Sequence, residues 1–259
     1  MKKVISIILL FLMIFNFSAC STSSESLVKG PVYPKAIAFD DFSKEREITD
    51  KNPVDKEVFD ALRQFTYLSS SKLFKNQSNN INYSPISLYL TLALASTAAN
   101  NETKDEIYSI LNITDKDDNY ISKQCANLYR LMYTDNEIGK LKLANSLWLD
   151  KNVKFKDDFI KNATTNFYSS LYNIDFSSNN DLQNMSQWIS DNTNGLLNPS
   201  FTTNPEQILS IINTIYFFDE WIDKFDEDKT AQDTFYLSNG DEIKCDFMNM
   251  TYSCSFNIL

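Results

Sequence analysis

The sequence predicts an α+β fold, because helical segments come first along the chain and strands and helices alternate after them. Four segments with helical spacing of apolar residues precede the first long strand pattern, KLKLANSLWLD. The later run 208–218 is apolar on both faces, which is typical of a central strand. With 259 residues and 43% apolar content, the chain can bury a substantial core in one large domain or two small ones.

Apolar spacing and capping residues indicate the four early helices. The first begins near Lys56 and turns inward a face formed by Val58, Leu62, Phe65 and Leu73. The second, SPISLYLTLALASTAA, is almost wholly apolar, with Ser84 as its N-cap and Pro85 in its first turn. A third is expected to begin at Thr103, where TKDE forms a capping box. The fourth carries its apolar face on Ile121, Cys125, Leu128 and Met132.

The second half of the chain alternates strand and helix patterns. KLKLANSLWLD and the shorter YNIDF are strand candidates. Between them, FKDDFIKNATTNF spaces its apolar residues by four, as a helix does, at Phe155, Phe159, Ala163 and Phe167. DLQNMSQWISDNTNG is predicted as a helix that ends near Gly195 and points inward Leu182, Met185, Trp188 and Ile189. After the strand 208–218, the dipeptide Asn239-Gly240 predicts a hairpin between two last strands.

Charge and composition exclude several functions. The chain has 24 basic and 34 acidic residues, a net charge of −10, which disfavours binding to nucleic acid or to anionic lipid. It contains no histidine, so Ser-His-Asp and Cys-His catalysis and imidazole metal ligands are excluded. No cofactor is expected. Chemistry by carboxylate, lysine or tyrosine remains open, although no acidic pair has the pattern of a glycosidase.

The first 19 residues are predicted to be an export signal. Lys2 and Lys3 are followed by an apolar run and by small residues before Cys20. The ending FSAC resembles a bacterial lipobox, with Phe17 where leucine is preferred, so Cys20 is expected to carry lipid and to begin the mature chain. The protein is then an exported lipoprotein at the cell surface or membrane. The alternatives are a secretory signal, giving a secreted protein, and a membrane anchor, for which the apolar run is short.

Residues 20–53 are rich in Ser, Gly, Pro and mixed charges and are predicted to be a flexible tether, so that the packed domain covers residues 54–259. Besides Cys20, the mature chain has three cysteines, Cys125, Cys245 and Cys254. Their number is odd and they form no CxxC pair, which indicates neither a disulfide framework nor a zinc site.

Taken together, these segments resemble the serpin family. NYSPISLYLTLAL, ETKDEI, LANSLWLD, MSQWISDNTNGLL, IINTIYFFDEWIDKF and TAQDTFYLSNGDEIKCDFM occur in the order and spacing of serpins. The resemblance implies helices packed on a large mixed or antiparallel main sheet. The sequence departs from the family pattern at Ser186, Thr214, Phe218-Asp219, Ala98 and Asn101, which suggests a divergent bacterial member.

The resemblance also accounts for Asn213, an amide in the middle of an apolar strand, where an unpaired amide costs about 1–3 kcal/mol. In serpins the corresponding region, called the shutter, lies between the start of the second helix and the third strand of the main sheet. By this analogy Ser84, Ser87 and Asn213 are mutual hydrogen-bond partners. Trp221 is expected near the top of the same strand, at the region called the breach.

Serpins inhibit serine or cysteine proteases by a suicide mechanism, which the resemblance implies here. An exposed reactive loop is cleaved and then inserted into the main sheet as a new strand, together with the acyl-enzyme. That loop lies near the C-terminus of the family. In this sequence the match stops shortly after the third strand, so the chain is expected to be a fragment or a non-inhibitory remnant without a reactive loop. No cleavage site or target protease can be assigned.

Two other classes compete with this interpretation. A solute-binding lipoprotein shares the lipobox and the acidic domain, but it is built from repeated strand-helix units around a hinge. A carboxylate hydrolase needs a separated acidic pair, whereas Asp117-Asp118 and Asp157-Asp158 are adjacent residues on solvated faces. The chain is therefore not expected to be an enzyme.

Overall fold

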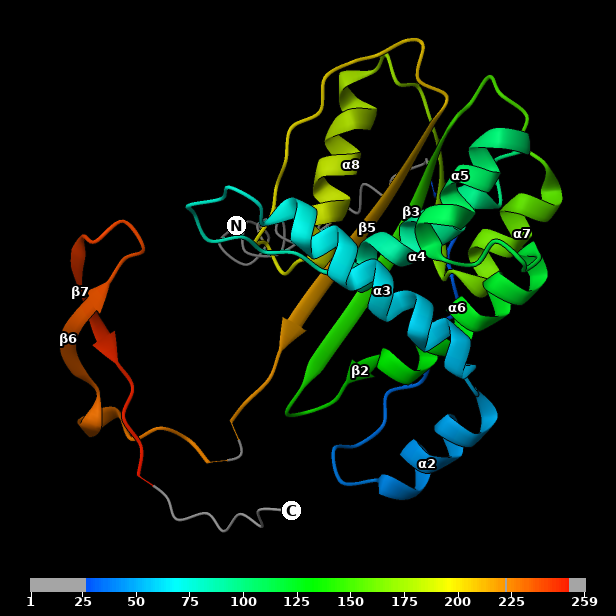
Figure 1. Ribbon diagram of the computed structural model, residues 1–259. Coiled ribbons are helices and arrows are strands. Elements are labelled where there is room, and N and C mark those ends of the chain that lie inside the picture. The colour runs from blue at the N-terminus through cyan, green and yellow to red at the C-terminus, as the bar shows by residue number, and fades with distance from the viewer. Residues whose placement is uncertain (1–26, 222, 252–259) are drawn as a thin grey trace, which may run out of the picture.

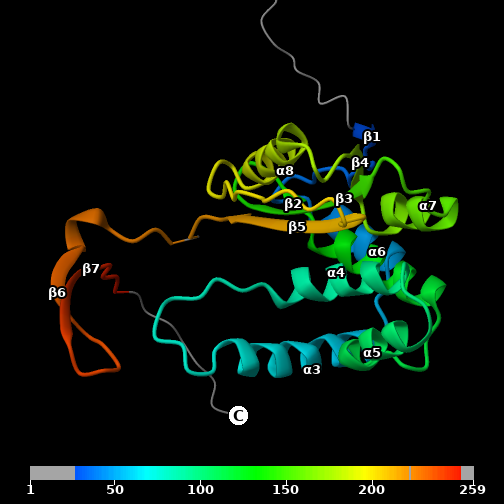
Figure 2. The same ribbon diagram turned by 90° about the horizontal axis from the view of Figure 1, so that it is seen from above.

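The computed structural model describes residues 27–221 and 223–251. A mixed sheet separates two layers of helices (Figures 1 and 2). On one face, α4 (Pro85–Ser96) and α6 (Asp118–Met132) lie next to the sheet, and α3 (Lys56–Leu73) and α5 (Asn101–Leu111) lie behind them. Helix α8 (Asn179–Asn192) covers the other face. The predicted α+β class, with helices on a mixed sheet, is confirmed.

Strand β3 (Lys140–Asp150) organises this sheet. On one side it pairs in parallel with β4 (Ser169–Ile174) and antiparallel with the short β2 (Thr134–Asp135). On the other side it pairs antiparallel with β5 (Leu209–Phe218) along ten residues. Helix α7 (Asp157–Asn166) connects β3 to β4, as a parallel pair requires.

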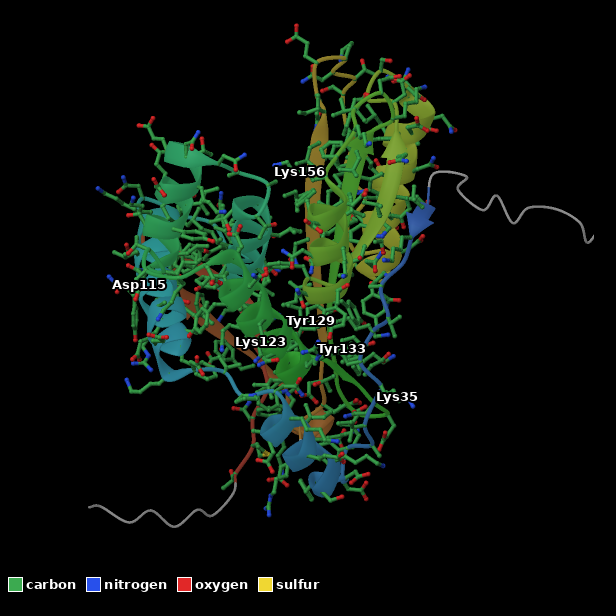
Figure 3. All side chains as sticks on the ribbon, turned by 90° about the vertical axis from the view of Figure 1, so that its right-hand side faces the viewer. Lys35, Asp115, Lys123, Tyr129, Tyr133 and Lys156 are labelled. Carbon is green, nitrogen blue, oxygen red and sulfur yellow. The ribbon has the colours of Figure 1, made fainter. Side chains whose placement is uncertain are left out.

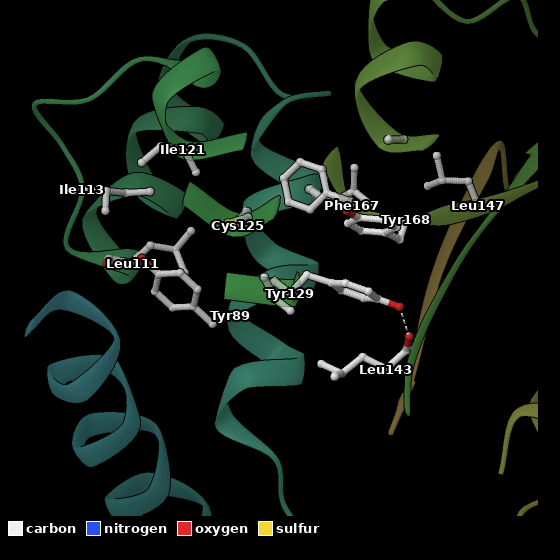
Figure 4. Close-up of a cluster of buried hydrophobic side chains, with 14 of the residues drawn as sticks. Tyr89, Leu111, Ile113, Ile121, Cys125, Tyr129, Leu143, Leu147, Phe167 and Tyr168 are labelled. Atoms are coloured by element: carbon white, nitrogen blue, oxygen red, sulfur yellow. Dashed lines mark hydrogen bonds between the residues drawn. The ribbon is translucent and has the colours of Figure 1, made fainter. Parts of the chain in front are cut away.

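The period-two alternation of β3 divides the core into two clusters. Leu143, Leu147 and Leu149 face helices α3 to α7 in the larger cluster, part of which is drawn in Figure 4. Ala144 and Trp148 face α8, where Met185 and Ile189 are buried. Both faces of β3 are therefore apolar, which explains its nearly continuous burial.

The strand β5 differs from the prediction. Its run of apolar residues predicts a central strand, but among the described residues only β3 pairs with it, so β5 is an edge strand. Most of its side chains are half-buried, and Phe217 is 70% exposed. The prediction was wrong because an apolar run indicates only that both faces of the strand are covered. It does not indicate how many strands pair with it in the plane of the sheet.

The predicted hairpin is present, with β6 (Ala231–Tyr236) paired antiparallel to β7 (Glu242–Phe247) as a separate two-stranded sheet. At the turn, Gly240 has φ +92°, a conformation that suits glycine. A short helix η2 (Glu227–Lys229) precedes the hairpin. Apolar side chains of the hairpin remain exposed, among them Phe235, Tyr236 and Ile243.

The helix ends are partly as predicted. Helix α4 begins at Pro85 after the Ser84 cap, and the turn after α8 contains Gly195 with φ +78°. Helix α5 begins at Asn101, so the predicted capping box at Thr103 lies inside the helix and was wrong as a helix start. On α3, Val58 and Phe65 are buried, whereas Leu73 in the last turn is 44% exposed.

The segment expected to be a flexible tether contains regular structure in its described part. Strand β1 (Leu27–Lys29) pairs antiparallel with β4, and α2 (Phe42–Lys51) follows as an exposed helix with the side chain of Asp41 as its cap. The expectation of a tether over 20–53 is therefore wrong for residues 27–53. Its composition shows no period, but β4 offers an unpaired edge that a neighbouring strand can satisfy.

Candidate functional site

A cavity of about 850 Å3 follows the outer edge of β5. One wall is the start of α4 with the residues before it, 82–91. The other is the end of α8 with the loop that follows it, where Thr193, Leu197 and Pro199 line the cavity. The β5 residues 212–217 lie between these two walls. The cavity therefore brings together segments more than a hundred residues apart in the sequence, as the shutter prediction requires.

The position of Asn213 on β5 decides which layer its amide faces. Ile211 and Ile215, two residues to either side, pack against the helical cluster that contains α4. Asn213 therefore points to the same layer. It is half-buried, and Asn145 of β3 stands directly opposite it in the strand register.

Two amides form a chain of hydrogen bonds across the sheet. Asn213 Nδ2 donates to Asn145 Oδ1 at 2.7 Å, and Asn145 Nδ2 donates to the backbone oxygen of Phe167 at 2.6 Å. Asn145 is only 2% exposed, so both of its amide groups would be costly to leave unpaired. The two hydrogen bonds join β5 through β3 to Phe167, two residues before β4 begins at Ser169.

The hydrogen bonds predicted among Ser84, Ser87 and Asn213 are not those found. Ser84 Oγ accepts from the backbone N–H of Ser87 at 3.3 Å and so caps α4, while the amide of Asn213 donates to Asn145. Ser87 Oγ, Asn213 Oδ1 and Thr214 Oγ1 are buried without a hydrogen-bond partner among the described residues. Ser84, Ser87 and Asn213 nevertheless line the same cavity.

Asn145 is the residue of this site that the sequence analysis missed. The signal was present in LANSLWLD, where an amide occupies an inward position between Leu143 and Leu147. The same reasoning that singled out Asn213 applies to it: a buried amide in an apolar strand requires a partner. Its partner could be identified only from the strand register.

Helix α6 supports the same part of the sheet. Tyr129 OH donates to the backbone oxygen of Leu143, a β3 residue between the stretches that pair with β2 and β4 (Figure 4). Burial raises the pKa of Tyr129, which keeps the phenol protonated as a donor. The ring of Tyr168 stacks on Tyr129 with centroids 4.2 Å apart. Tyr168 has φ +51°, an unusual conformation for a bulky residue, next to the Phe167 carbonyl that Asn145 holds.

The remaining predicted site residues lie apart from the cavity or outside the described residues. Trp221 follows the end of β5 by three residues, is 68% exposed and packs edge-on against Phe225 at 5.9 Å. Cys20 lies outside the described residues. Within residues 27–221 and 223–251, no group of three or more His, Cys, Asp or Glu side chains is placed to hold a metal ion.

The chemistry of the cavity suits hydrogen bonding more than proton transfer. Its polar atoms belong to amides and hydroxyls, and the rest of the lining is largely aliphatic and aromatic. The outer edge of β5 adds backbone groups that no described strand satisfies. Such a surface is suited to an extended polypeptide, which would pair with the strand edge and offer partners to Asn213 and Ser87. None of the helices in the described part of the chain is long and apolar enough to cross a membrane.

Comparisons with known proteins agree with this architecture. A family model described as Serpin (serine protease inhibitor) matches residues 60–257. Serpin-ZX of Arabidopsis thaliana is 28% identical over 179 residues, which cover 67% of this chain and 46% of that relative. Antithrombin-III of Homo sapiens is 29% identical over 183 residues, which cover 67% of this chain and 39% of that relative.

A solved structure extends the likeness to the fold. The crystal structure of Serpin48 from Tenebrio molitor superimposes with a TM-score of 0.67 at 25% identity, covering 75% of this chain and 54% of that one. The chain spans about half the length of the relatives it matches. Because the family model covers more than half of the 259 residues, this chain belongs to the serpin family.

Proposed function

We propose that residues 54–259 form the N-terminal part of a serpin domain whose complete form inhibits serine or cysteine endopeptidases. The observation that carries this proposal is the open edge of β5, with its cavity and its unpartnered polar atoms Ser87 Oγ and Asn213 Oδ1. A strand that enters beside β5 would find backbone groups along the edge and polar partners at its middle.

The same arrangement fits a sheet that must open. In the mechanism that the family implies, a protease cleaves a reactive loop and remains attached to it as an acyl-enzyme. The cleaved loop then enters the main sheet as a strand. Entry requires that β5 separate from a neighbour without separating from β3. The Asn213–Asn145 hydrogen bond ties β5 to β3 on its inner side, while polar groups on the outer side can exchange partners at low cost.

Relatives support the inhibitory role, since they include proteins named antithrombin-III and serine protease inhibitor A3K. This chain alone provides one side of the site, because β5 pairs with no described strand on its outer edge. We therefore propose that residues 20–259 by themselves trap no protease, and that a reactive loop has to come from a longer form of the protein.

A gel assay tests this proposal. Residues 20–259 are incubated with a panel of serine and cysteine proteases, beside a longer form that carries a reactive loop. We expect an SDS-stable covalent complex with the longer form and none with residues 20–259. If residues 20–259 give such a complex, the reactive loop lies within them. If the longer form gives none with any protease of the panel, the inhibitory function is contradicted.

We also propose that the mature protein begins at Cys20, carries lipid there and is exported to a membrane surface. The supporting residues are Lys2, Lys3, the apolar run after them and the small residues before Cys20. Mass spectrometry of the mature N-terminus in its native host provides the test. A lipid-modified Cys20 is expected, and an unmodified N-terminus at another residue, with the protein free in the medium, would reject it.

A further inference from the structure

The chain contacts the domain from Leu27 onward, only seven residues after the proposed lipidation site Cys20. Its composition predicts instead a flexible tether that reaches residue 53. β1 pairs with β4, and Tyr33 stacks on Tyr133 of the α6–β2 junction with ring centroids 6.1 Å apart. Figure 3 shows Lys35 and Tyr133 on the same side of the molecule, where this segment passes. Further contacts continue to the start of α3: Arg130 Nη1 to Asn52 Oδ1 at 3.2 Å, Asn127 Nδ2 to the Pro53 oxygen at 2.7 Å and the Asp55 N–H to Gln124 Oε1 at 2.9 Å.

The direction of β1 determines where the chain leaves the domain. β1 runs antiparallel to β4, with Leu27 opposite Tyr172 and Lys29 opposite Leu171. The start of β1 at Leu27 is therefore directed toward the C-terminal end of β4. The loop 151–156 lies at this end, because the N–H of Lys151 donates to the Ile174 oxygen at 2.9 Å and Lys151 Nζ pairs with Asp175 at 2.9 Å. We call β1, the end of β4 and loop 151–156 the exit rim.

The length of chain between lipid and exit rim is short. Cys20 and Leu27 are seven residues apart, and a chain of that length spans at most about 25 Å when fully extended. A flexible tether that reached residue 53 would allow several times this distance and free rotation of the domain. Because β1 is docked, the domain cannot turn the exit rim far from the point of lipid attachment.

From this geometry we propose that the exit rim faces a lipid bilayer and that the open edge of β5 faces away from it. The inference rests on the proposed lipid attachment at Cys20. The strand order places β1 at one edge of the sheet and β5 across β4 and β3 from it, and Figure 2 shows α3 farther still from β1. The cavity along β5 is then directed to the surroundings, where a protease or a polypeptide strand can reach it.

The charges of the exit rim are compatible with a lipid surface although the whole chain carries a net charge of −10. Its four basic residues are Lys29, Lys151, Lys154 and Lys156, and the four acidic residues beside them are Asp150, Asp157, Asp158 and Asp175. The rim therefore carries no acidic excess, unlike the chain as a whole, which reduces the repulsion from anionic headgroups there. Val28 and Val153, which are 55% and 38% exposed, add apolar contact.

Energy transfer from the protein to labelled lipid measures this orientation. Residues 20–259, with Cys245 and Cys254 replaced by Ser, receive a donor fluorophore at Asn152→Cys in the exit rim or at Ser71→Cys on α3. Cys20 stays protected while the fluorophore is attached. It is then deprotected and its amino group is joined to a lipid thioester by ligation, which leaves the internal cysteines unacylated. The product is bound to vesicles of phosphatidylethanolamine and phosphatidylglycerol that contain an acceptor lipid. We expect loss of donor fluorescence at position 152 and a clearly smaller loss at position 71.

Equal losses at the two positions, or a larger loss at position 71, would overturn the proposal. A matched variant has about twenty Gly and Ser residues inserted after Ser26. The insertion lengthens the connection between Cys20 and Leu27 without changing the described fold. In this variant the loss of donor fluorescence should be the same at positions 152 and 71. If the difference persists, the short connection between Cys20 and Leu27 does not cause the orientation. Because the lipid is attached chemically, this result is independent of mass spectrometry of the native N-terminus, so failure of lipidation and failure of orientation are distinguishable.

Discussion

At the scale of single residues, the two central amides are the clearest case of a polar group that the apolar core tolerates because it is paired. Asn213 Nδ2 donates to Asn145, and Asn145 donates onward to the Phe167 oxygen. Removal of the middle residue breaks both hydrogen bonds and leaves a donor and an acceptor without partners in a region where Asn145 is 2% exposed. Desolvation without compensation is the costly part of such a change.

We therefore expect Asn145→Ala to lower the free energy of unfolding of residues 20–259 by about 1–3 kcal/mol. Urea denaturation followed by circular dichroism measures the change. Asn173→Ala on the neighbouring strand β4 is the matched control, because Asn173 is exposed and should change the stability by less than about 0.5 kcal/mol. Equal effects of the two substitutions would show that the amide chain contributes nothing to stability.

The thiol of Cys125 provides a second residue-scale prediction. Cys125 is 2% exposed, and burial raises its pKa to about 12. At pH 8 its thiolate fraction is then about one part in ten thousand, and the thiolate is the reactive form. Iodoacetamide at pH 8 should therefore modify the partly exposed Cys245 and leave Cys125 unmodified in the folded protein.

Mass spectrometry of tryptic peptides reads out both sites. In urea, where burial no longer raises the pKa of Cys125, both cysteines should react at similar rates. Modification of Cys125 in the folded protein as fast as Cys245 would show that helix α6 does not protect it.

At the scale of elements, the starts of helices α4 and α5 show when a capping motif is informative. Ser84 caps α4 as predicted, since its side chain accepts from the Ser87 N–H at 3.3 Å and Pro85 follows in the first turn. The TKDE motif at Thr103 lies inside α5, which begins two residues earlier. Asn101 has φ +51° and directs the chain into the helix at that point.

The two serines at the start of α4 are expected to behave differently when truncated. Ser84→Ala removes the cap and should cost about 0.5–2 kcal/mol of stability. Ser87→Ala removes a buried hydroxyl that has no described hydrogen-bond partner, so its effect should be close to zero or slightly stabilising. Urea denaturation of both variants measures the difference.

Ser84→Asp serves as the control, because aspartate also caps helices and should retain most of the stability. A large loss with Ser87→Ala would instead mean that the Ser87 hydroxyl is paired in solution. The hydrogen bonding originally predicted between Ser87 and the strand would then gain support over the arrangement described here.

At the scale of the whole molecule, the side of β5 that faces away from β3 is the least covered part of the sheet. Phe217 is 70% exposed, and the unpaired backbone groups of β5 lie along the same edge. The β6–β7 hairpin also exposes apolar side chains. An open, apolar strand edge tends to pair with other chains.

Residues 20–259 should therefore self-associate in a concentration-dependent way. Sedimentation velocity over a range of concentrations measures the association. Phe217→Lys places a charge at the strand edge and should weaken it, whereas Phe59→Lys on α3, at a residue that is 42% exposed, should not. If both substitutions weaken the association equally, the change in net charge explains the effect. If Phe217→Lys leaves the association unchanged, the β5 edge is excluded as the site of association.

The sequence by itself determined the elements and their buried faces. The spacing of Leu182, Met185, Trp188 and Ile189 predicts the inward face of α8, and all four are buried. The alternation of KLKLANSLWLD gives β3, and Asn239-Gly240 gives the hairpin turn. These features depend on the local geometry of helices, strands and turns, which residues close together in the sequence determine. The runs that resemble serpins likewise led to the family that the comparisons show.

Only the tertiary structure decided which groups meet. It made β5 an edge strand within the described residues, paired Asn213 with Asn145 in place of Ser84 or Ser87, and docked residues 27–29 on β4 where a flexible tether was expected. Each of these outcomes depends on strand register and on which edge or polar group remains unsatisfied after the elements have packed. Such contacts join residues as far apart as Asn145 and Asn213, and no local pattern of apolar and polar residues encodes them.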